Sequence, residues 1–253
     1  MSVRQPAAAN GNADRILIVL HQPGSTAGRV GELLEERGYT LERCRPCCGD
    51  DLPRDLSPYG GVVVFGGPMS ANDCQKFDGI RLEIEHAKRV LDAGIPYLGL
   101  CLGAQILSRA LGGVVTPHPS DHVEVGYTEI IPEPGAGGVF EHATHFFQFH
   151  REGFEVPPGG ELLATGTNSF PNQAFRVGEK AYGLQFHPEI TLEMIHRWNM
   201  GGAHRLTRPG AQPKRAHIKG FELFNDSIER WSRALFDRMG MPGVMRHRAE
   251  AAE

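Results

Sequence analysis

The chain of 253 residues is 40% hydrophobic and 22% charged, which is ordinary for a globular protein. A net charge of −4 gives no electrostatic reason to bind nucleic acid, and no apolar run approaches the roughly 18 residues that a membrane span requires. Five irregularly spaced cysteines favour reduced thiols over a disulfide framework. We therefore expect a cytoplasmic protein that binds neither nucleic acid nor membranes.

The first part of the chain alternates strands with helices. Residues 1–13 lack the apolar segment of a signal peptide and are expected to form a flexible tail. Runs enriched in apolar and β-branched residues predict strands over 15–20, 39–43, 61–65 and 95–100. Apolar residues at helical spacing predict helices over 26–37, 77–93 and 104–111, each followed by a glycine. This alternation favours an α/β fold with a flavodoxin-like, doubly wound, parallel sheet.

The pattern changes after residue 113. Residues 123–130 alternate apolar and polar side chains, as a half-exposed strand does. Further short strands are predicted over 146–149, 161–165, 172–176 and 180–186. Residues 176–180 resemble a hairpin turn between the last two of these strands.

The C-terminal part is predicted to contain two helices and a long loop. We expect a helix over 191–200, a polar loop rich in glycine and proline over 201–219, and an amphipathic helix over 221–239. The apolar stripe of the last helix is expected to pack onto the domain rather than to bind a partner. The predicted organisation is a tail (1–13), a domain (14–200), and a C-terminal loop and helix packed on that domain with a frayed end (201–253).

Cys101 lies where the strand over 95–100 meets the following helix. Gly99 and Gly103 stand two residues to either side of it, which is the Gly-x-Cys-x-Gly form of a nucleophile elbow. Such a sharp turn needs small residues at these positions, because larger side chains would clash between strand and helix. The helix N-terminus favours the thiolate. The alternative is a buried structural cysteine, which is common in apolar segments.

Two further blocks strengthen the catalytic interpretation. His187 and Glu189 follow a strand-like run, 86 residues after Cys101, and side chains two apart in an extended chain point to the same side. The His can accept the thiol proton, and the carboxylate can orient that His. Upstream, Gly66-Gly67-Pro68 follows a buried strand, where free backbone N–H groups can stabilise an oxyanion.

These three blocks, in this order, resemble the class I glutamine amidotransferase family, and most of all its stand-alone members related to the amidotransferase part of GMP synthase. The resemblance covers roughly residues 15 to 195. It implies a mostly parallel sheet with an antiparallel extension. It also implies a catalytic triad of Cys101, His187 and Glu189, and an oxyanion hole formed by the N–H groups of Gly67 and Leu102. The residues that it implies for substrate binding are Gln105, Phe149, His150 and Glu152.

The chain departs from relatives of the GMP synthase type at two points. Many of them carry His-Gly-Asp where this chain has His150-Arg151-Glu152, so the choice of substrate at this loop is open. The sequence also lacks an ATP-pyrophosphatase signature, so ammonia would pass to a separate synthetase or acceptor subunit, or its release would be the reaction. No cofactor and no metal are expected, because the Cys-x-x-Cys spacing of Cys44 and Cys47 is not followed by a second pair.

Four functions are consistent with these features. The first is glutamine amide hydrolysis, by a stand-alone amidotransferase subunit or glutaminase. The second is hydrolysis of γ-glutamyl amides or peptides by the same triad. The third is a non-catalytic binding module on the same fold, against which the intact Cys101, His187 and Glu189 argue. The fourth, a thiol redox sensor, leaves Gly66-Gly67-Pro68 unexplained.

Overall fold

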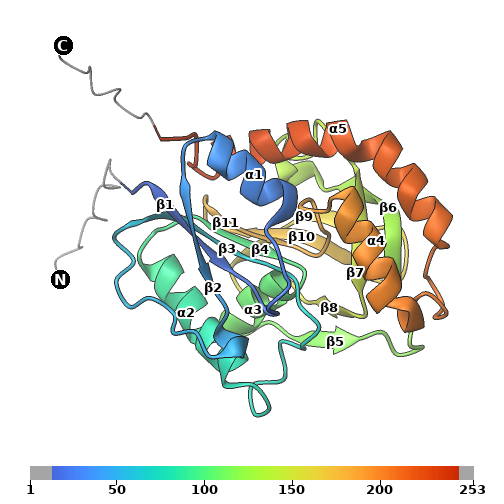
Figure 1. Cartoon of the computed structure of the whole chain (residues 1–253), viewed down its shortest axis with the longest axis horizontal. Helices are drawn as coiled ribbons and strands as arrows, with labels where there is room; N and C mark the ends of the chain where they lie inside the picture. Colours follow the sequence, from blue (N-terminus) through green and yellow to red (C-terminus); the bar gives the residue numbers. More distant parts are fainter. Residues whose placement is uncertain (1–12, 245–253) are drawn as a thin grey trace.

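The computed structural model describes residues 13–244 (Figure 1). The predicted N-terminal tail, apart from Ala13, and the predicted frayed C-terminal end lie outside these residues. Within residues 13–244, no helix combines the length and the apolar character needed to cross a membrane.

The main sheet of the described residues is mixed and has nine strands in the order β2-β1-β3-β4-β11-β10-β9-β6-β7. The first five strands in this order are mutually parallel, and each later neighbour pairs antiparallel. The strands are β1 (Arg15–Val19), β2 (Thr40–Cys44), β3 (Tyr59–Val64), β4 (Tyr97–Leu100), β6 (Glu124–Pro132), β7 (His145–His150), β9 (Gly160–Gly166), β10 (Asn172–Val177) and β11 (Ala181–Leu184). The predicted α/β class, with a parallel sheet and an antiparallel extension, is confirmed.

Helices cover both faces of this sheet. Figure 1 shows α1 (Gly28–Glu36), α4 (Leu192–Gly201) and α5 (Lys214–Arg238) on one side, and α2 (Asp78–Asp92) and α3 (Leu102–Ala110) on the other. The alternation of β1 explains the two layers: Ile16 and Ile18 pack with α1 and α5, whereas Leu17 and Val19 pack with α2 and α3. The sheet is therefore doubly wound, as predicted.

The two strands nearest the centre of the sheet bring distant parts of the sequence together. In the parallel pairing of β4 with β11, Leu100 lies opposite Leu184. Cys101 follows the end of β4, and its backbone N–H donates to the Leu184 carbonyl oxygen over 2.7 Å. The carboxyl ends of both strands thus meet at one edge of the sheet, where sites gather in folds of this kind.

The predicted loop over 201–219 is wrong in part. A 3₁₀ turn, η3 (Ala203–Arg205), lies within it, and α5 already begins at Lys214. Pro213 precedes this helix in an extended conformation, and proline is compatible with a helix start. Residues 214–219 are mostly good helix formers, but they carry no apolar stripe that would have revealed the helix.

The apolar stripe of α5 packs inward. Ile228, Trp231 and Leu235 are at most 2% exposed and belong to the same core as α1 and the antiparallel strands. Two short strands that the sequence did not reveal, β5 (Val115–Pro117) and β8 (Glu152–Phe154), form a separate antiparallel pair. The boundary placed at residue 200 stays a prediction.

Candidate active site

Cys101 forms the sharp turn between β4 and α3. Its φ is +51°, a backbone conformation that few residues other than glycine adopt. A Cβ atom on Gly99 would lie 2.4 Å from the Gly103 carbonyl oxygen, and one on Gly103 would lie 2.1 Å from the Val64 carbonyl oxygen. Strand and helix therefore pack backbone against backbone around Cys101, which is the reason for the glycine spacing.

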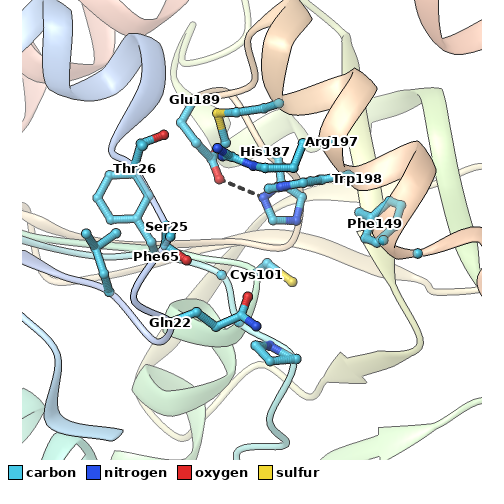
Figure 2. A pocket seen from close by; sticks show the side chains of 18 of the residues that line it. Gln22, Ser25, Thr26, Phe65, Cys101, Phe149, His187, Glu189, Arg197 and Trp198 are labelled. Atoms are coloured by element: carbon cyan, nitrogen blue, oxygen red, sulfur yellow. Dashed lines mark hydrogen bonds and ion pairs between the residues drawn. The ribbon is translucent and has the colours of Figure 1, made fainter. Parts of the chain in front are cut away.

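His187 and Glu189 form a buried pair beyond the end of β11. The His187 Nδ1 and Glu189 Oε1 atoms are 2.7 Å apart, and the two residues are 2% and 1% exposed. Burial opposes protonation of the ring, but the Glu189 carboxylate and negative charge at Cys101 outweigh it, so the pKa of His187 is raised to about 10. Figure 2 shows the ring between Glu189 and Cys101, with its second nitrogen, Nε2, on the Cys101 side. The arrangement favours a protonated imidazolium beside the sulfur.

Two buried amide side chains, Gln105 and Gln185, form a hydrogen-bonded chain that ends at the sulfur. Gln185 Nε2 donates to Cys101 Sγ over 3.7 Å, and Gln105 Nε2 donates to Gln185 Oε1 over 3.3 Å. The second hydrogen of Gln105 Nε2 is directed to the Glu152 carbonyl oxygen, 2.9 Å away. The Gln105 amide nitrogen is thus fully used, and its carbonyl oxygen is the atom left for a ligand. Sequence reasoning missed Gln185 as a site residue, although it stands two residues before His187.

Glycines allow the loop after β3 to approach the same place. A Cβ atom on Gly66 would lie 2.7 Å from Cε1 of His187, so only glycine fits beside the ring. Gly67 lines the same cavities as Cys101. Leu102 is the first residue of α3, where backbone N–H groups have no partner within the helix. The glycine loop and the first turn of α3 therefore both border the cavities at Cys101.

Two cavities meet at Cys101. The larger, of about 450 Å³, lies on the side of His187 and Trp198 (Figure 2). The smaller, of about 20 Å³, has room for about one water molecule. The residues predicted for the site all border one or both of them: Gly67, Cys101, Leu102, Gln105, Phe149, His150, Glu152, His187 and Glu189. The fold thus brings the whole predicted set together.

The predicted substrate-binding residues differ in which of their polar groups are already engaged within the protein. The ring of His150 is 3% exposed and engaged on both sides, with Nε2 at 3.1 Å from Glu124 Oε2 and Nδ1 at 3.0 Å from the Glu152 carbonyl oxygen. Its position shapes the wall of the small cavity. Phe149 borders both cavities and is partly buried. The Glu152 backbone is held by Gln105 and His150, while its carboxylate is close enough to raise the pKa of Arg205.

Arg205 is a site residue that the sequence did not reveal. It ends η3 within the predicted loop and borders both cavities. Its guanidinium lies 5.3 Å from the centre of the Phe149 ring, and Nη1 donates to the Phe149 carbonyl oxygen over 3.4 Å. Burial lowers the pKa of Arg205, and negative charge at Cys101 opposes that lowering. A cationic side chain therefore borders the small cavity beside the sulfur.

A metal site is not formed by the described residues: no three His, Cys, Asp or Glu side chains between 13 and 244 stand together as ligands. Cys44 and Cys47 are free thiols in this part of the chain. Burial raises the pKa of each to about 12, with the Glu83 carboxylate contributing to both. These thiols are therefore poor nucleophiles at neutral pH.

Comparison with known proteins shows the family to which the chain belongs. Residues 32–197 match the model of the family described as glutamine amidotransferase class-I. A GMP synthase [glutamine-hydrolyzing] of Porphyromonas gingivalis is 37% identical over 143 residues, which cover 55% of this chain but only 26% of the synthase. The glutamine amidotransferase-like protein YfeJ of Salmonella typhimurium is 30% identical over 191 residues, 72% of this chain and 78% of that protein.

Solved structures show the same fold. The crystal structure of a glutamine amidotransferase from Thermotoga maritima superposes with a TM-score of 0.80 at 26% identity, covering 90% of this chain and 98% of that one. The chain spans about a quarter of the length of the synthase above, so the comparison concerns one part of that enzyme. From the family match, the overall fold and the similarity to YfeJ, the chain belongs to the class-I glutamine amidotransferase family.

Proposed function

We propose that this protein hydrolyses the side-chain amide of glutamine to glutamate and ammonia, as a stand-alone amidotransferase subunit or glutaminase. One observation carries the proposal: a cysteine in a strained turn at a helix N-terminus faces a buried His187–Glu189 pair. Strain at a turn and a strongly shifted pKa in a cleft are features that cluster at catalytic sites.

The proposed reaction begins with the Cys101 thiolate, whose proton is on His187. The sulfur attacks the amide carbon, and the N–H groups of Gly67 and Leu102 stabilise the oxyanion. His187 returns the proton to the nitrogen, so that the C–N bond breaks and ammonia leaves. Water, deprotonated by His187, then hydrolyses the thioester. Glu189 keeps the ring in the orientation that serves each step.

The small cavity is the proposed site for the amino-acid end of the substrate. Arg205 provides the positive charge for the α-carboxylate, and Glu152 and the Gln105 carbonyl oxygen provide acceptors for the α-ammonium group. Phe149 and His150 form part of the wall of this cavity. Room for about one water means that Arg205, or the Phe149 ring beneath it, moves when substrate enters.

A separate synthetase or acceptor subunit is the proposed recipient of the ammonia. The chain resembles the part of GMP synthases that it spans, and those enzymes carry "glutamine-hydrolyzing" in their name. An enzyme that hydrolysed glutamine without an acceptor would waste it, so we expect partner binding to raise the rate.

One observation favours the second function, hydrolysis of larger γ-glutamyl amides. The cavity of about 450 Å³ lies on the His187 side of the sulfur, where the leaving amine departs, and ammonia needs far less space. Its walls combine Trp198 and Phe149 with the exposed Arg197 and His204, which suits an amine carrying an apolar body and an anionic group. A non-catalytic binding module is the least supported function, because nothing in binding alone requires the strained Cys101.

The test is a substrate screen with purified protein, with and without cell extract. Release of glutamate is measured by mass spectrometry from glutamine, γ-glutamyl amines and γ-glutamyl peptides, with Cys101→Ala as the blank. Turnover of glutamine supports the first function, and turnover of conjugates alone supports the second. No release from any γ-glutamyl compound in either condition contradicts both.

A further inference from the structure

A buried polar pair lies behind the glycine loop that follows β3. His21 stands two residues after the end of β1, which lies beside β3 in the sheet, and Glu83 projects from α2. The His21 Nε2 and Glu83 Oε2 atoms are 2.9 Å apart, and the residues are 1% and 3% exposed. Neither residue borders the two cavities at Cys101. The reaction proposed above leaves both without a role.

The other nitrogen of His21 contacts the loop itself. His21 Nδ1 is 3.3 Å from the carbonyl oxygen of Gly66. Because a carbonyl oxygen only accepts, Nδ1 carries the hydrogen, whichever member of the pair holds the second proton. Glu83 therefore fixes the ring from one side, and the ring fixes the Gly66 carbonyl from the other.

That carbonyl belongs to the peptide unit that also carries the N–H of Gly67. The unit is trans, so its C=O and N–H point in opposite directions. The C=O faces His21, which lies outside the cavities, while Gly66 and Gly67 both border the cavity at Cys101. The Gly67 N–H thus points away from His21, and Gly67 borders both cavities at Cys101.

We propose that His21 and Glu83 are positioning residues that hold the Gly66–Gly67 peptide in the orientation that presents the Gly67 N–H to the reaction oxyanion. Two successive glycines can rotate such a peptide at little steric cost. Without the His21 hydrogen bond, the peptide is free to flip and turn the Gly66 carbonyl oxygen toward the site. A lone pair would then face the developing negative charge. This inference rests on the proposed cysteine amide hydrolysis.

The packing supports an orienting role. A Cβ atom on Gly67 would lie 2.7 Å from Cβ of His21, so the ring sits directly against the loop. Cys47 adds a contact from the turn after β2, with Sγ 3.8 Å from Glu83 Oε1. The second carboxylate oxygen is therefore also engaged, which limits the rotation of Glu83. Residues from the end of β1, from α2 and from the turn after β2 therefore hold the His21–Glu83 pair in place.

The test compares three variants with one control. His21→Leu removes the donor to Gly66, His21→Asn keeps an amide N–H near the position of Nδ1, and Glu83→Gln weakens the brace. His86→Leu is the matched control, because His86 is also a buried histidine. It lies in α2, borders neither cavity and has no hydrogen bond to the glycine loop after β3. Folding of each variant is checked by circular dichroism and urea unfolding.

Two readouts separate positioning from general structural damage. The first is kcat and KM on the substrate that the wild type turns over. The second is the rate at which iodoacetamide alkylates Cys101, a displacement that needs no oxyanion hole. For His21→Leu we expect kcat to fall on the order of 100-fold with little change in KM, as after loss of one oxyanion donor. Alkylation should stay near the wild-type rate.

We also expect a definite order of kcat among the remaining variants. His21→Asn should recover at least about a tenth of the wild-type kcat, Glu83→Gln should lie between the two, and His86→Leu should keep kcat while losing stability. If His21→Leu lowers kcat no more than His86→Leu, or lowers kcat and alkylation together, the inference is wrong. A wild type that hydrolyses no γ-glutamyl compound instead contradicts the proposed function, and the inference with it.

Discussion

The imidazole of His187 meets the indole of Trp198 edge to face, with their ring centroids 4.9 Å apart. Trp198 projects from α4, so a helix that follows the triad covers one side of its central member. The indole covers one side of the ring, and burial of the His187–Glu189 pair lets the carboxylate act on the ring through a medium of low dielectric constant. The catalytic predictions below depend on this enclosed pair.

The nucleophile assignment predicts a selective loss. Cys101→Ala should abolish glutamate release while the fold is retained, because both side chains are small. A glutamine-like diazo-ketone should label Cys101 and spare Cys44 and Cys47, whose pKa values are raised to about 12 by burial. Mass spectrometry of the labelled peptides is the measurement. Activity above a few per cent in the alanine variant, or equal labelling of all cysteines, contradicts the assignment.

The proposed triad predicts that substitutions of His187 and of Glu189 lower kcat to different extents. His187→Asn should lower kcat by a factor on the order of 100 or more, since positioned proton transfer contributes about 10²–10⁴. Glu189→Gln should cost less, because the carboxylate orients the ring and transfers no proton. A direct ammonia assay measures both. Equal rates for the wild type and His187→Asn would remove His187 from the mechanism.

The raised pKa of His187 predicts a pH limit for activity. The imidazolium must be present to protonate the leaving nitrogen, so kcat/KM should decline as pH rises through about 10. Glu189→Gln removes a carboxylate that raises this pKa, and the decline should move to lower pH. The pH profiles of kcat/KM for both proteins measure the shift. If kcat/KM declines at the same pH in both proteins, a group other than His187 sets this pH limit.

The same pKa predicts a pH-dependent stability. The folded pKa lies above the ordinary value of 6.5, so the stabilisation by His187 is complete below pH 6.5 and is lost as pH rises to about 10. Urea unfolding should therefore show that the wild type loses its advantage over His187→Asn between these two values. A constant difference would contradict a protonated resting His187.

The position of Arg205 predicts a binding effect. Arg205→Leu should raise KM for glutamine about tenfold or more, since a hydrogen bond to a charged group contributes about 1.5–3 kcal/mol. Arg208→Leu is the matched control, because that side chain pairs with Asp121 at 2.9 Å. Steady-state kinetics measures both variants. If substrate analogues without an α-carboxylate suffer the same loss, Arg205 acts on another group.

The close packing around the turn predicts a stability effect at Gly103. A methyl group there would meet the Val64 carbonyl oxygen, a backbone atom that cannot move aside. Gly103→Ala should destabilise the fold by at least the roughly 1–3 kcal/mol of ordinary overpacking. Gly201→Ala, where a Cβ atom meets nothing within 4 Å, should be neutral or stabilising. Urea unfolding measures the free energy of unfolding of both variants, and equal values for the two would contradict the prediction.

Local rules explain why much of the site was predictable. The spacing of Gly99, Cys101 and Gly103 reflects contacts between adjacent elements. The pairing of His187 with Glu189 is a contact between residues two apart, although Glu189 lies in a turn after β11 and not in an extended strand. The alternation of strands and helices likewise predicted the doubly wound sheet.

Contacts between distant residues were not predictable in the same way. Arg205 reaches Phe149 across 56 residues, and His21 reaches Glu83 across 62, without any local pattern that marks either contact. The strands β5 and β8 have only three residues each and exist through their mutual pairing. The start of α5 was missed because residues 214–219 lack an apolar period, although their helix propensity is good.

The pairing of β4 with β11 has a consequence for how the protein acquires activity. Cys101 and His187 are neighbours because these strands lie side by side, whereas α3 and the antiparallel strands stand between them in the sequence. Contacts of such long sequence separation form slowly, since loop closure is entropically costly. We therefore expect the thiol to gain its partner late in folding, so that a partly folded chain carries a cysteine without its catalytic base.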